Sequence, residues 1–217
     1  MQKETIQLAS ITKKIIMSLA GLFLFVFLTL HLTLNLLILK GDQGQSFIAA
    51  ANFMQTNELV EMMEMPLFAI FILHMFLGVW VSIKNLMARP VNYKVKGSSE
   101  ETIFSKYILH TGIVVGIFLS IHLMNFYFIK EGFVAAPDGI GSNDMYNLMI
   151  HLFKNPVYSI IYIGLLAFMG FHLVHAFQSA FQTLGINHKI IKIIGVTYSL
   201  ALTIGFIIIP IGVYLKS

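Results

Sequence analysis

Cysteine is absent from this chain of 217 residues. Its absence excludes disulfide bonds, thiolate ligation of an iron–sulfur cluster and the C-x-x-C-H attachment of a c-type haem. Any redox cofactor held by this chain therefore needs nitrogen ligands, and any iron–sulfur cluster must belong to a partner chain.

Charge is also scarce. Only 11% of the residues are charged and 57% are hydrophobic, with a mean hydropathy of +0.82, whereas soluble domains contain about 25% charged residues. The composition predicts an integral membrane protein. Five apolar segments are long enough to cross roughly 30 Å of hydrocarbon as helices: about 15–39, 62–87, 107–129, 156–181 and 193–215.

Backbone groups in lipid must be hydrogen-bonded within their own segment, so all five segments are expected to be helices. The predicted fold is an all-α integral membrane protein, with residues 1–217 forming a single membrane domain. Every connector is too short to fold into a catalytic domain. The stretch 47–54 is amphipathic and is expected at the membrane interface, and 131–156 is expected to be an external loop.

Lysine and arginine concentrate on one side of the predicted membrane. The N-terminus and the second and fourth connectors hold ten of the fourteen basic residues: Lys3, Lys13, Lys14, Lys84, Arg89, Lys94, Lys96, Lys106, Lys189 and Lys192. The positive-inside rule then predicts an N-terminus in the cytoplasm and a C-terminus outside. The net charge of +4 needs no nucleic-acid partner to explain it.

Four histidines stand in four different apolar segments, each about sixteen residues after the polar start of its segment: His31, His74, His122 and His172. An ionisable side chain in a hydrocarbon span is costly and therefore points to a function. The commonest function of a buried histidine is to present a neutral ring nitrogen to a metal, including haem iron. The alternative for one intramembrane histidine is a hydrogen bond to a neighbouring helix, but four at matched offsets favour ligands.

Successive helices run in opposite directions, so equal offsets give alternating depths. His31 and His122 lie on outward-running helices, about 24 Å from the cytoplasmic start, which places them in the outer half. His74 and His172 lie on inward-running helices and fall in the inner half. Two pairs at two depths are what two stacked bis-histidine haems require. We therefore expect four helices to form a haem-binding bundle, with the fifth at its periphery.

The remaining histidines are interpreted differently. His175 lies three residues after His172 and forms a polar stripe with Gln178, Ser179 and Gln182. This stripe suits a contact with haem propionates, a docked partner or a solvated helix end, and His175 also competes with His172 as a ligand. Interfacial or structural roles are expected for His110, His151 and His188.

The sequences around the four histidines form an ordered set. They are F-L-T-L-H-L-T-L-N at 27–35, I-L-H-M-F-L-G at 72–78, S-I-H at 120–122 and G-F-H-L-V-H-A-F-Q-S-A-F at 170–181. This set resembles the di-haem cytochrome b membrane anchors of succinate:menaquinone oxidoreductases and quinol:fumarate reductases. The resemblance covers nearly the whole chain in helix number, helix length and histidine order.

The resemblance implies that His31 and His122 bind the outer of two b haems, and that His74 and His172 bind the inner one. It also implies menaquinone as substrate, and a flavoprotein subunit and an iron–sulfur subunit docked on the cytoplasmic face of a bacterial inner membrane. Such a chain is the quinone-reactive electron-transfer subunit of succinate dehydrogenase or fumarate reductase, the respiratory complex II of the tricarboxylic acid cycle. Dicarboxylate chemistry would occur in the partner.

In that family, quinone chemistry near the outer haem uses a carboxylate. Here Glu61 is the first candidate and Glu58 the second, at the outer start of the second helix. The alternative is a solvated helix N-terminus, where the helix dipole favours acids. Two other functions remain open for the whole chain: the cytochrome b subunit of a hydrogenase or formate dehydrogenase, and a proton-coupled transporter whose histidines relay protons.

Overall fold

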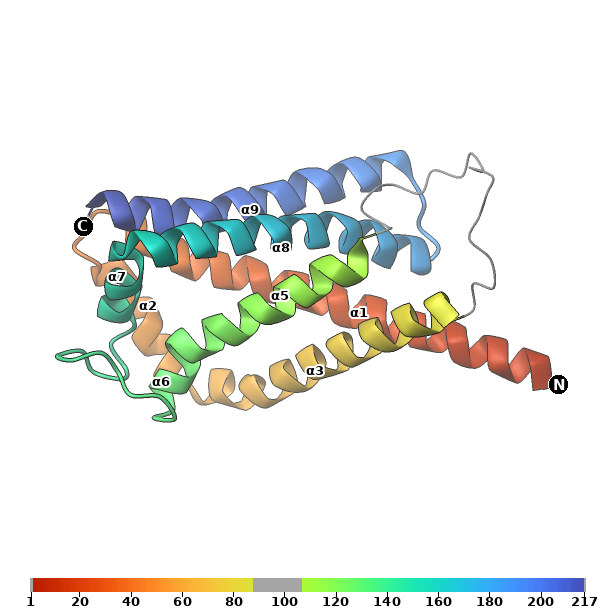
Figure 1. Ribbon diagram of the computed structural model, residues 1–217, viewed down its shortest axis with the longest axis horizontal. Helices are drawn as coiled ribbons and strands as arrows, with labels where there is room; N and C mark the ends of the chain where they lie inside the picture. The colour runs from red at the N-terminus through yellow and green to blue at the C-terminus, as the bar shows by residue number, and fades with distance from the viewer. Residues whose placement is uncertain (1, 88–106, 217) are drawn as a thin grey trace.

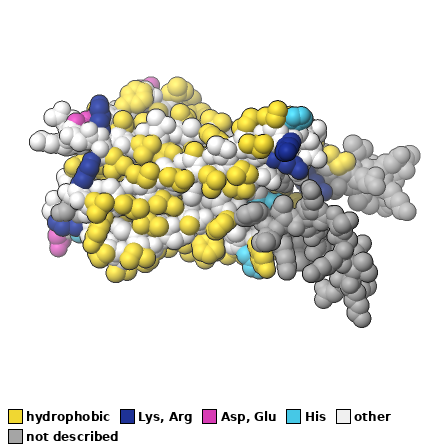
Figure 2. All heavy atoms as spheres, turned by 90° about the horizontal axis from the view of Figure 1, so that it is seen from above, with side chains coloured by type: hydrophobic (Ala, Val, Ile, Leu, Met, Phe, Trp, Pro, Cys, Tyr) yellow, Lys and Arg dark blue, Asp and Glu magenta, His cyan; other side chains and the backbone are white. Residues whose placement is uncertain are grey.

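The structure is a computed structural model that describes residues 2–87 and 107–216 (Figure 1). The connector at 88–106, which holds four of the basic residues used to predict the orientation, lies outside the described residues. Within these residues, five helices are long and apolar enough to cross a membrane, so the predicted all-α, multi-pass membrane fold is confirmed. Hydrophobic side chains cover the flank of the molecule and charged ones gather near its two ends (Figure 2).

The long helices follow the predicted segments closely. They are α1 (Gln2–Leu36), which the 3-10 turn η1 (Leu37–Leu39) extends, α3 (Glu58–Met87), α5 (Ile108–His122), α8 (Pro156–Thr183) and α9 (Lys189–Lys216). The largest difference is at α1, which begins at Gln2 rather than near residue 15. Hydropathy locates the start of the apolar span, whereas the polar residues before it are compatible with a helix.

α8 and α9 lie side by side and form the most buried part of the bundle (Figure 1). Tyr162 and Leu166 of α8, like Leu202 and Val213 of α9, are each at most 4% exposed. A glycine allows this close approach, since a Cβ at position 170 would stand 2.6 Å from Thr203 Oγ1. Small residues bring membrane helices together in this way.

The other three long helices complete a ring with α8. α1 packs against α3 and α8, and α5 also packs against α3 and α8. α1 and α5 therefore occupy opposite corners of the ring, and α3 and α8 occupy the other two. α9 packs on α8 and α1. The apolar side chains of α3 and α5 are largely exposed, including Ile72, Phe76, Ile113 and Ile117, as a surface facing lipid tails would be.

Two short helices lie at the end of the bundle that holds the C-terminus (Figure 1): α2 (Gln45–Thr56) and α7 (Met145–Lys154). α2 contains the amphipathic stretch expected at the interface. α7 is a difference from the prediction, because the segment was expected to be a loop. Asp144 caps α7 by accepting a 3.0 Å hydrogen bond from the Asn147 amide, and Leu148 and Phe153 are buried. The glycine, aspartate and asparagine residues that flank this helix are typical of loops, so its apolar face was not recognised in the sequence.

The close contact between α8 and α9 predicts a specific sensitivity to side-chain size. Gly170→Ala should lower the free energy of unfolding by about 1–3 kcal/mol, because the added methyl overlaps Thr203 of α9. Gly164→Ala is the matched control on the same helix, since a Cβ there meets nothing within 4 Å. Thermal unfolding in detergent, followed by circular dichroism, should show a lower midpoint for Gly170→Ala alone. Equal midpoints for the two variants would contradict this packing.

Candidate functional site

The four intramembrane histidines meet as two pairs. The ring centroids of His31 on α1 and His122 on α5 are 5.6 Å apart, and those of His74 on α3 and His172 on α8 are 6.4 Å apart. Each pair therefore joins two helices at opposite corners of the ring. The structure brings together the residues that the depth argument paired, while their role as ligands stays a prediction.

The spacing within each pair suits a metal held between two imidazoles. An imidazole nitrogen binds a transition metal at about 2 Å and lies about 1 Å from its ring centre, so two rings on opposite sides of one metal have centres about 6 Å apart. The observed centroid distances of 5.6 and 6.4 Å bracket this value. Both pairs meet edge to face, and edge-to-face ring contacts have centroid separations of about 4.5–7 Å. The spacing is therefore compatible with a shared metal but does not by itself require one.

One ring nitrogen in each of three of these histidines lacks a partner among the described residues. The Nδ1 atoms of His74, His122 and His172 are buried and have no hydrogen-bond partner within the described residues. A buried polar atom without a partner costs about 1–3 kcal/mol. His74 hydrogen-bonds the backbone of Met17 on α1 and so joins two helices. The three unpartnered Nδ1 atoms nevertheless fit a site that is completed by a bound group.

Glycines lie against the rings of one pair. A Cβ at Gly21 of α1 would stand 3.4 Å from His74 Cε1, and a Cβ at Gly112 of α5 would stand 3.6 Å from His172 Cε1. Gly21 precedes His31 by ten residues, and Gly112 precedes His122 by the same ten. Ten helical residues rise about 15 Å, so the two pairs lie at two levels about half a hydrocarbon thickness apart.

Aromatic rings surround the pair formed by His31 and His122. Phe27 and Phe206 lie 5.5 and 6.0 Å from His31, measured between ring centroids, and Phe126 lies 5.2 Å from His122. Phe206 belongs to α9, so the fifth helix, expected at the periphery, contributes directly to the wall of this level. These rings exclude water from the imidazoles.

A π-helical turn follows His122 directly. The turn, η2 (Leu123–Tyr127), places Asn125 so that its Nδ2 donates a 2.8 Å hydrogen bond to the hydroxyl of Tyr162 on α8. Tyr162 is 2% exposed and its ring lies 6.5 Å from His122. Such single π turns occur frequently at functional sites. Sequence reasoning missed both residues, and only an asparagine in the middle of an apolar segment could have signalled the contact.

The remaining histidines divide by exposure. His110, His151 and His188 are exposed, as expected for interfacial or structural residues. His188 Nδ1 accepts a 3.2 Å hydrogen bond from the Ile190 amide at the start of α9. His175 is half-buried one turn beyond His172, and its contact with haem propionates stays a prediction.

The acids at the start of α3 differ in environment. Glu58 and Glu61 lie in the first turn and are exposed, whereas Glu64 is half-buried and accepts a 3.1 Å hydrogen bond from Lys130 Nζ. Lys130 also pairs with Glu131 at 3.2 Å. The structure therefore brings Glu64 into contact with α6 (Phe128–Lys130), and the quinone roles of Glu61 and Glu58 stay predictions.

The donor set restricts the group that could bind. Across residues 2–87 and 107–216, no three histidine or acidic side chains form a metal cluster. A protein zinc site uses three or four protein ligands, whereas haem iron receives four nitrogens from its porphyrin and needs only one or two from the protein. Imidazole pairs therefore fit haem and do not fit a zinc site.

No protein-family model matches this chain, and neither a curated protein nor a solved structure does. The functional interpretation therefore depends on the geometry of the two histidine pairs.

The Asn125–Tyr162 hydrogen bond predicts a stability difference between two tyrosines of α8. Tyr162→Phe leaves the Asn125 amide buried without its partner and should lower the free energy of unfolding by about 1–3 kcal/mol. Tyr158→Phe, on the exposed side of the same helix, is the control and should change it by less than about 0.5 kcal/mol. Asn125→Leu combined with Tyr162→Phe should cost less than the sum of the single changes. Strict additivity in this thermal double-mutant cycle would show that the two side chains do not interact.

Proposed function

We propose that this chain is the di-haem cytochrome b membrane anchor of a succinate dehydrogenase or fumarate reductase. In this role it passes electrons between a cytoplasmic iron–sulfur subunit and menaquinone. The observation that carries the proposal is the arrangement of the four imidazoles as two pairs. Each pair joins two helices at opposite corners of the four-helix ring, and its rings are spaced as two ligands around one metal would be. The unpartnered ring nitrogens support it independently.

In this proposal His31 and His122 hold one haem b, and His74 and His172 hold the other. A bound haem supplies a reversible one-electron couple. The chain orients its imidazoles on rigid helices, fixes the two levels about 15 Å apart by helical rise, and excludes water with the phenylalanines around the outer pair. The glycines at the inner level keep the space beside its imidazoles free of side chains.

Quinone reduction consumes protons as well as electrons, so the anchor needs a proton-exchanging group. We assign this role first to Glu61 and then to Glu58, because both carboxylates are exposed in the first turn of α3, at the end of the bundle nearer His31 and His122. Glu64 is the third carboxylate of this group, but it is half-buried and already forms an ion pair with Lys130.

The distribution of charge supports the proposed orientation. Lys13, Lys84, Lys189 and Lys192 lie at the end of the bundle where α1 and α9 begin, while the acids at the start of α3 lie at the opposite end. By the positive-inside rule the lysine-rich end faces the cytoplasm of a bacterial cell. The flavoprotein and iron–sulfur subunits would dock at that end, next to the level formed by His74 and His172.

Two alternatives lead to different observations. A cytochrome b subunit of a hydrogenase or formate dehydrogenase would have the same two histidine levels, so the identity of the chains that copurify from native membranes separates it from the proposal. A proton-coupled transporter would use the histidines without a cofactor. An optical spectrum of the purified protein without b-type haem bands would favour the transporter and overturn the proposal.

The pairing predicts which histidines serve the same haem. His31→Ala and His122→Ala should each remove or alter one of two b-haem components, and His74→Ala and His172→Ala should each affect the other, because every variant removes one of two axial ligands. Haem content and redox titration measure this. His151→Ala is an exposed control that should retain both components, and His175→Ala should have a smaller effect than His172→Ala. A shared component for His31 and His74 would contradict the pairing.

The proposed proton exchange predicts a separation of turnover from haem binding. Glu61→Gln should slow quinone reduction by roughly 10²-fold or more while both haems remain, because it removes a proton-exchanging group without removing a ligand. Asn52→Ala, at an exposed position of α2, is a control that should leave turnover unchanged. The assay is electron transfer from succinate to a menaquinone analogue in the purified complex. Full turnover in Glu61→Gln would reassign the role to Glu58, which is tested by the same substitution.

A further inference from the structure

The only tryptophan of the chain, Trp80, contacts two lysines from two helices. Lys13 of α1 and Lys84 of α3 each place their ammonium nitrogen 5.5 Å from the centroid of the Trp80 ring. The two cations are therefore no more than about 11 Å apart, which is close to the Debye length of roughly 8–10 Å at physiological salt. The indole face stabilises each cation by a cation–π interaction but does not neutralise either charge.

Among the side chains of residues 11–84 and 107–216, no acid forms an ion pair with Lys13 or Lys84. By contrast, Lys130 at the other end of the bundle pairs with two glutamates. The lysine–tryptophan–lysine cluster is therefore a local concentration of positive charge that favours binding of an anion.

Lys13 and Trp80 also line a groove with apolar walls. Together with Phe76 and Leu77 they border a surface hollow of about 120 Å³ between α1 and α3. The Phe76 ring lies 5.9 Å from the Trp80 ring, and these side chains are 60% and 42% exposed. A cationic rim above exposed apolar walls, in a helix that spans the membrane, matches a molecule with an anionic head and a hydrocarbon tail.

We propose that this groove binds an anionic phospholipid. The phosphate lies between Lys13 and Lys84, the Trp80 ring sits at the level of the headgroups, where tryptophan is enriched in membrane proteins, and an acyl chain extends along Phe76 and Leu77. The chemistry selects a phospholipid over a soluble anion, because a soluble anion would leave the apolar walls unused. The inference depends only on the membrane-spanning fold and not on the proposed haem sites.

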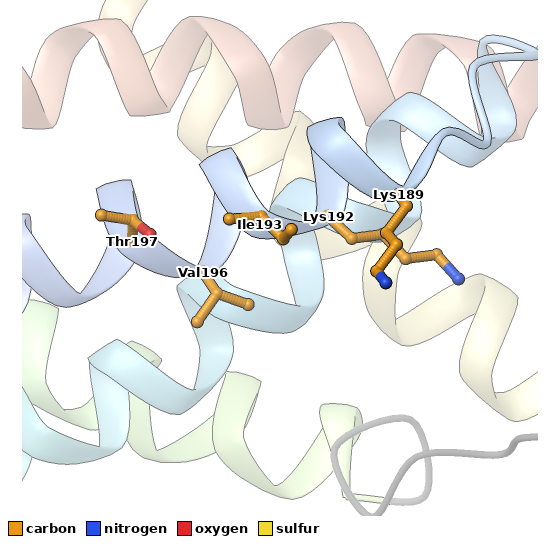
Figure 3. Close-up of a pocket in the computed structure, with 5 residues that line it drawn as sticks. All are labelled: Lys189, Lys192, Ile193, Val196 and Thr197. Atoms are coloured by element: carbon orange, nitrogen blue, oxygen red, sulfur yellow. The ribbon is translucent and has the colours of Figure 1, made fainter.

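A second lysine pair at the same end of the bundle offers a matched comparison. Lys189 and Lys192 lie at the start of α9 and line a more open hollow of about 270 Å³ with Ile193, Val196 and Thr197 (Figure 3). This pair carries the same charge, but no aromatic ring of the described residues forms a cation–π contact with it. Substituting this second pair therefore distinguishes a specific lipid site from the general attraction of basic residues to an anionic surface.

Because Trp80 is the only tryptophan, its fluorescence reports directly on the groove. The purified full chain is reconstituted into phosphatidylcholine vesicles that contain increasing fractions of phospholipid with dibrominated acyl chains, which quench a tryptophan on contact. Brominated phosphatidylglycerol should reach half-maximal quenching at a mole fraction about tenfold or more below that of brominated phosphatidylcholine, since each lysine near the surface contributes about fivefold.

Variants identify the residues responsible. The double change Lys13→Gln with Lys84→Gln should make the two quenching curves coincide, and Lys13→Arg with Lys84→Arg should retain the preference. The control change Lys189→Gln with Lys192→Gln should behave as the unmodified chain. Circular dichroism establishes that each variant is folded.

Three results would overturn the proposal. The first is coincident curves in the unmodified chain, and the second is an equal loss of preference in the Lys189 and Lys192 control, which would indicate general surface electrostatics. The third is loss of the preference in excess inorganic phosphate, which would identify a soluble anion as the ligand. Copurification of an acidic protein that depends on Lys13 and Lys84, without a lipid preference, would assign the cluster to a protein partner instead.

Discussion

Burying an imidazole in a membrane is the constraint on which the rest of this structure depends. Lipid offers no hydrogen bonds, so each ring nitrogen must find a partner inside the bundle or carry a cost of a few kcal/mol. Here the Nδ1 atoms of His74, His122 and His172 have no partner among the described residues, although His74 hydrogen-bonds the backbone of Met17 on α1. In the proposed function, a haem between the members of each pair would supply the missing partner.

The bundle has a tightly packed part and a loosely packed part. α8 and α9 approach closely through Gly170 and bury most of the core, whereas α3 and α5 expose much of their apolar surface. The close packing of α8 against α9 holds the backbone of His172 in place, and Phe206 of α9 packs against His31.

The sequence predicted the five spans and the pairing of the histidines because both depend on one-dimensional quantities. Hydropathy measures the length of a span, and a constant rise per residue converts the offset of each histidine into a depth. Contacts that depend on rotation around the helix axis were not predictable in this way. The π turn after His122 shifts the side chains that follow it, so Asn125 meets Tyr162 at a place that no regular helical period indicates. α7 was missed for another reason, since polar residues at both of its ends outweighed Leu148 and Phe153.

The ten-residue interval from glycine to histidine in α1 and α5 limits how such a protein can change. Backbone hydrogen bonds set the rise of a helix, so no single substitution moves one level of the bundle toward the other. Side chains around a level can alter its polarity and packing freely, but the separation changes only when residues are inserted or deleted. One added residue would also rotate the histidine by about 100° away from its partner. The distance between the levels is therefore a fixed quantity of the fold, whereas the properties of each level remain open to adjustment by ordinary mutation.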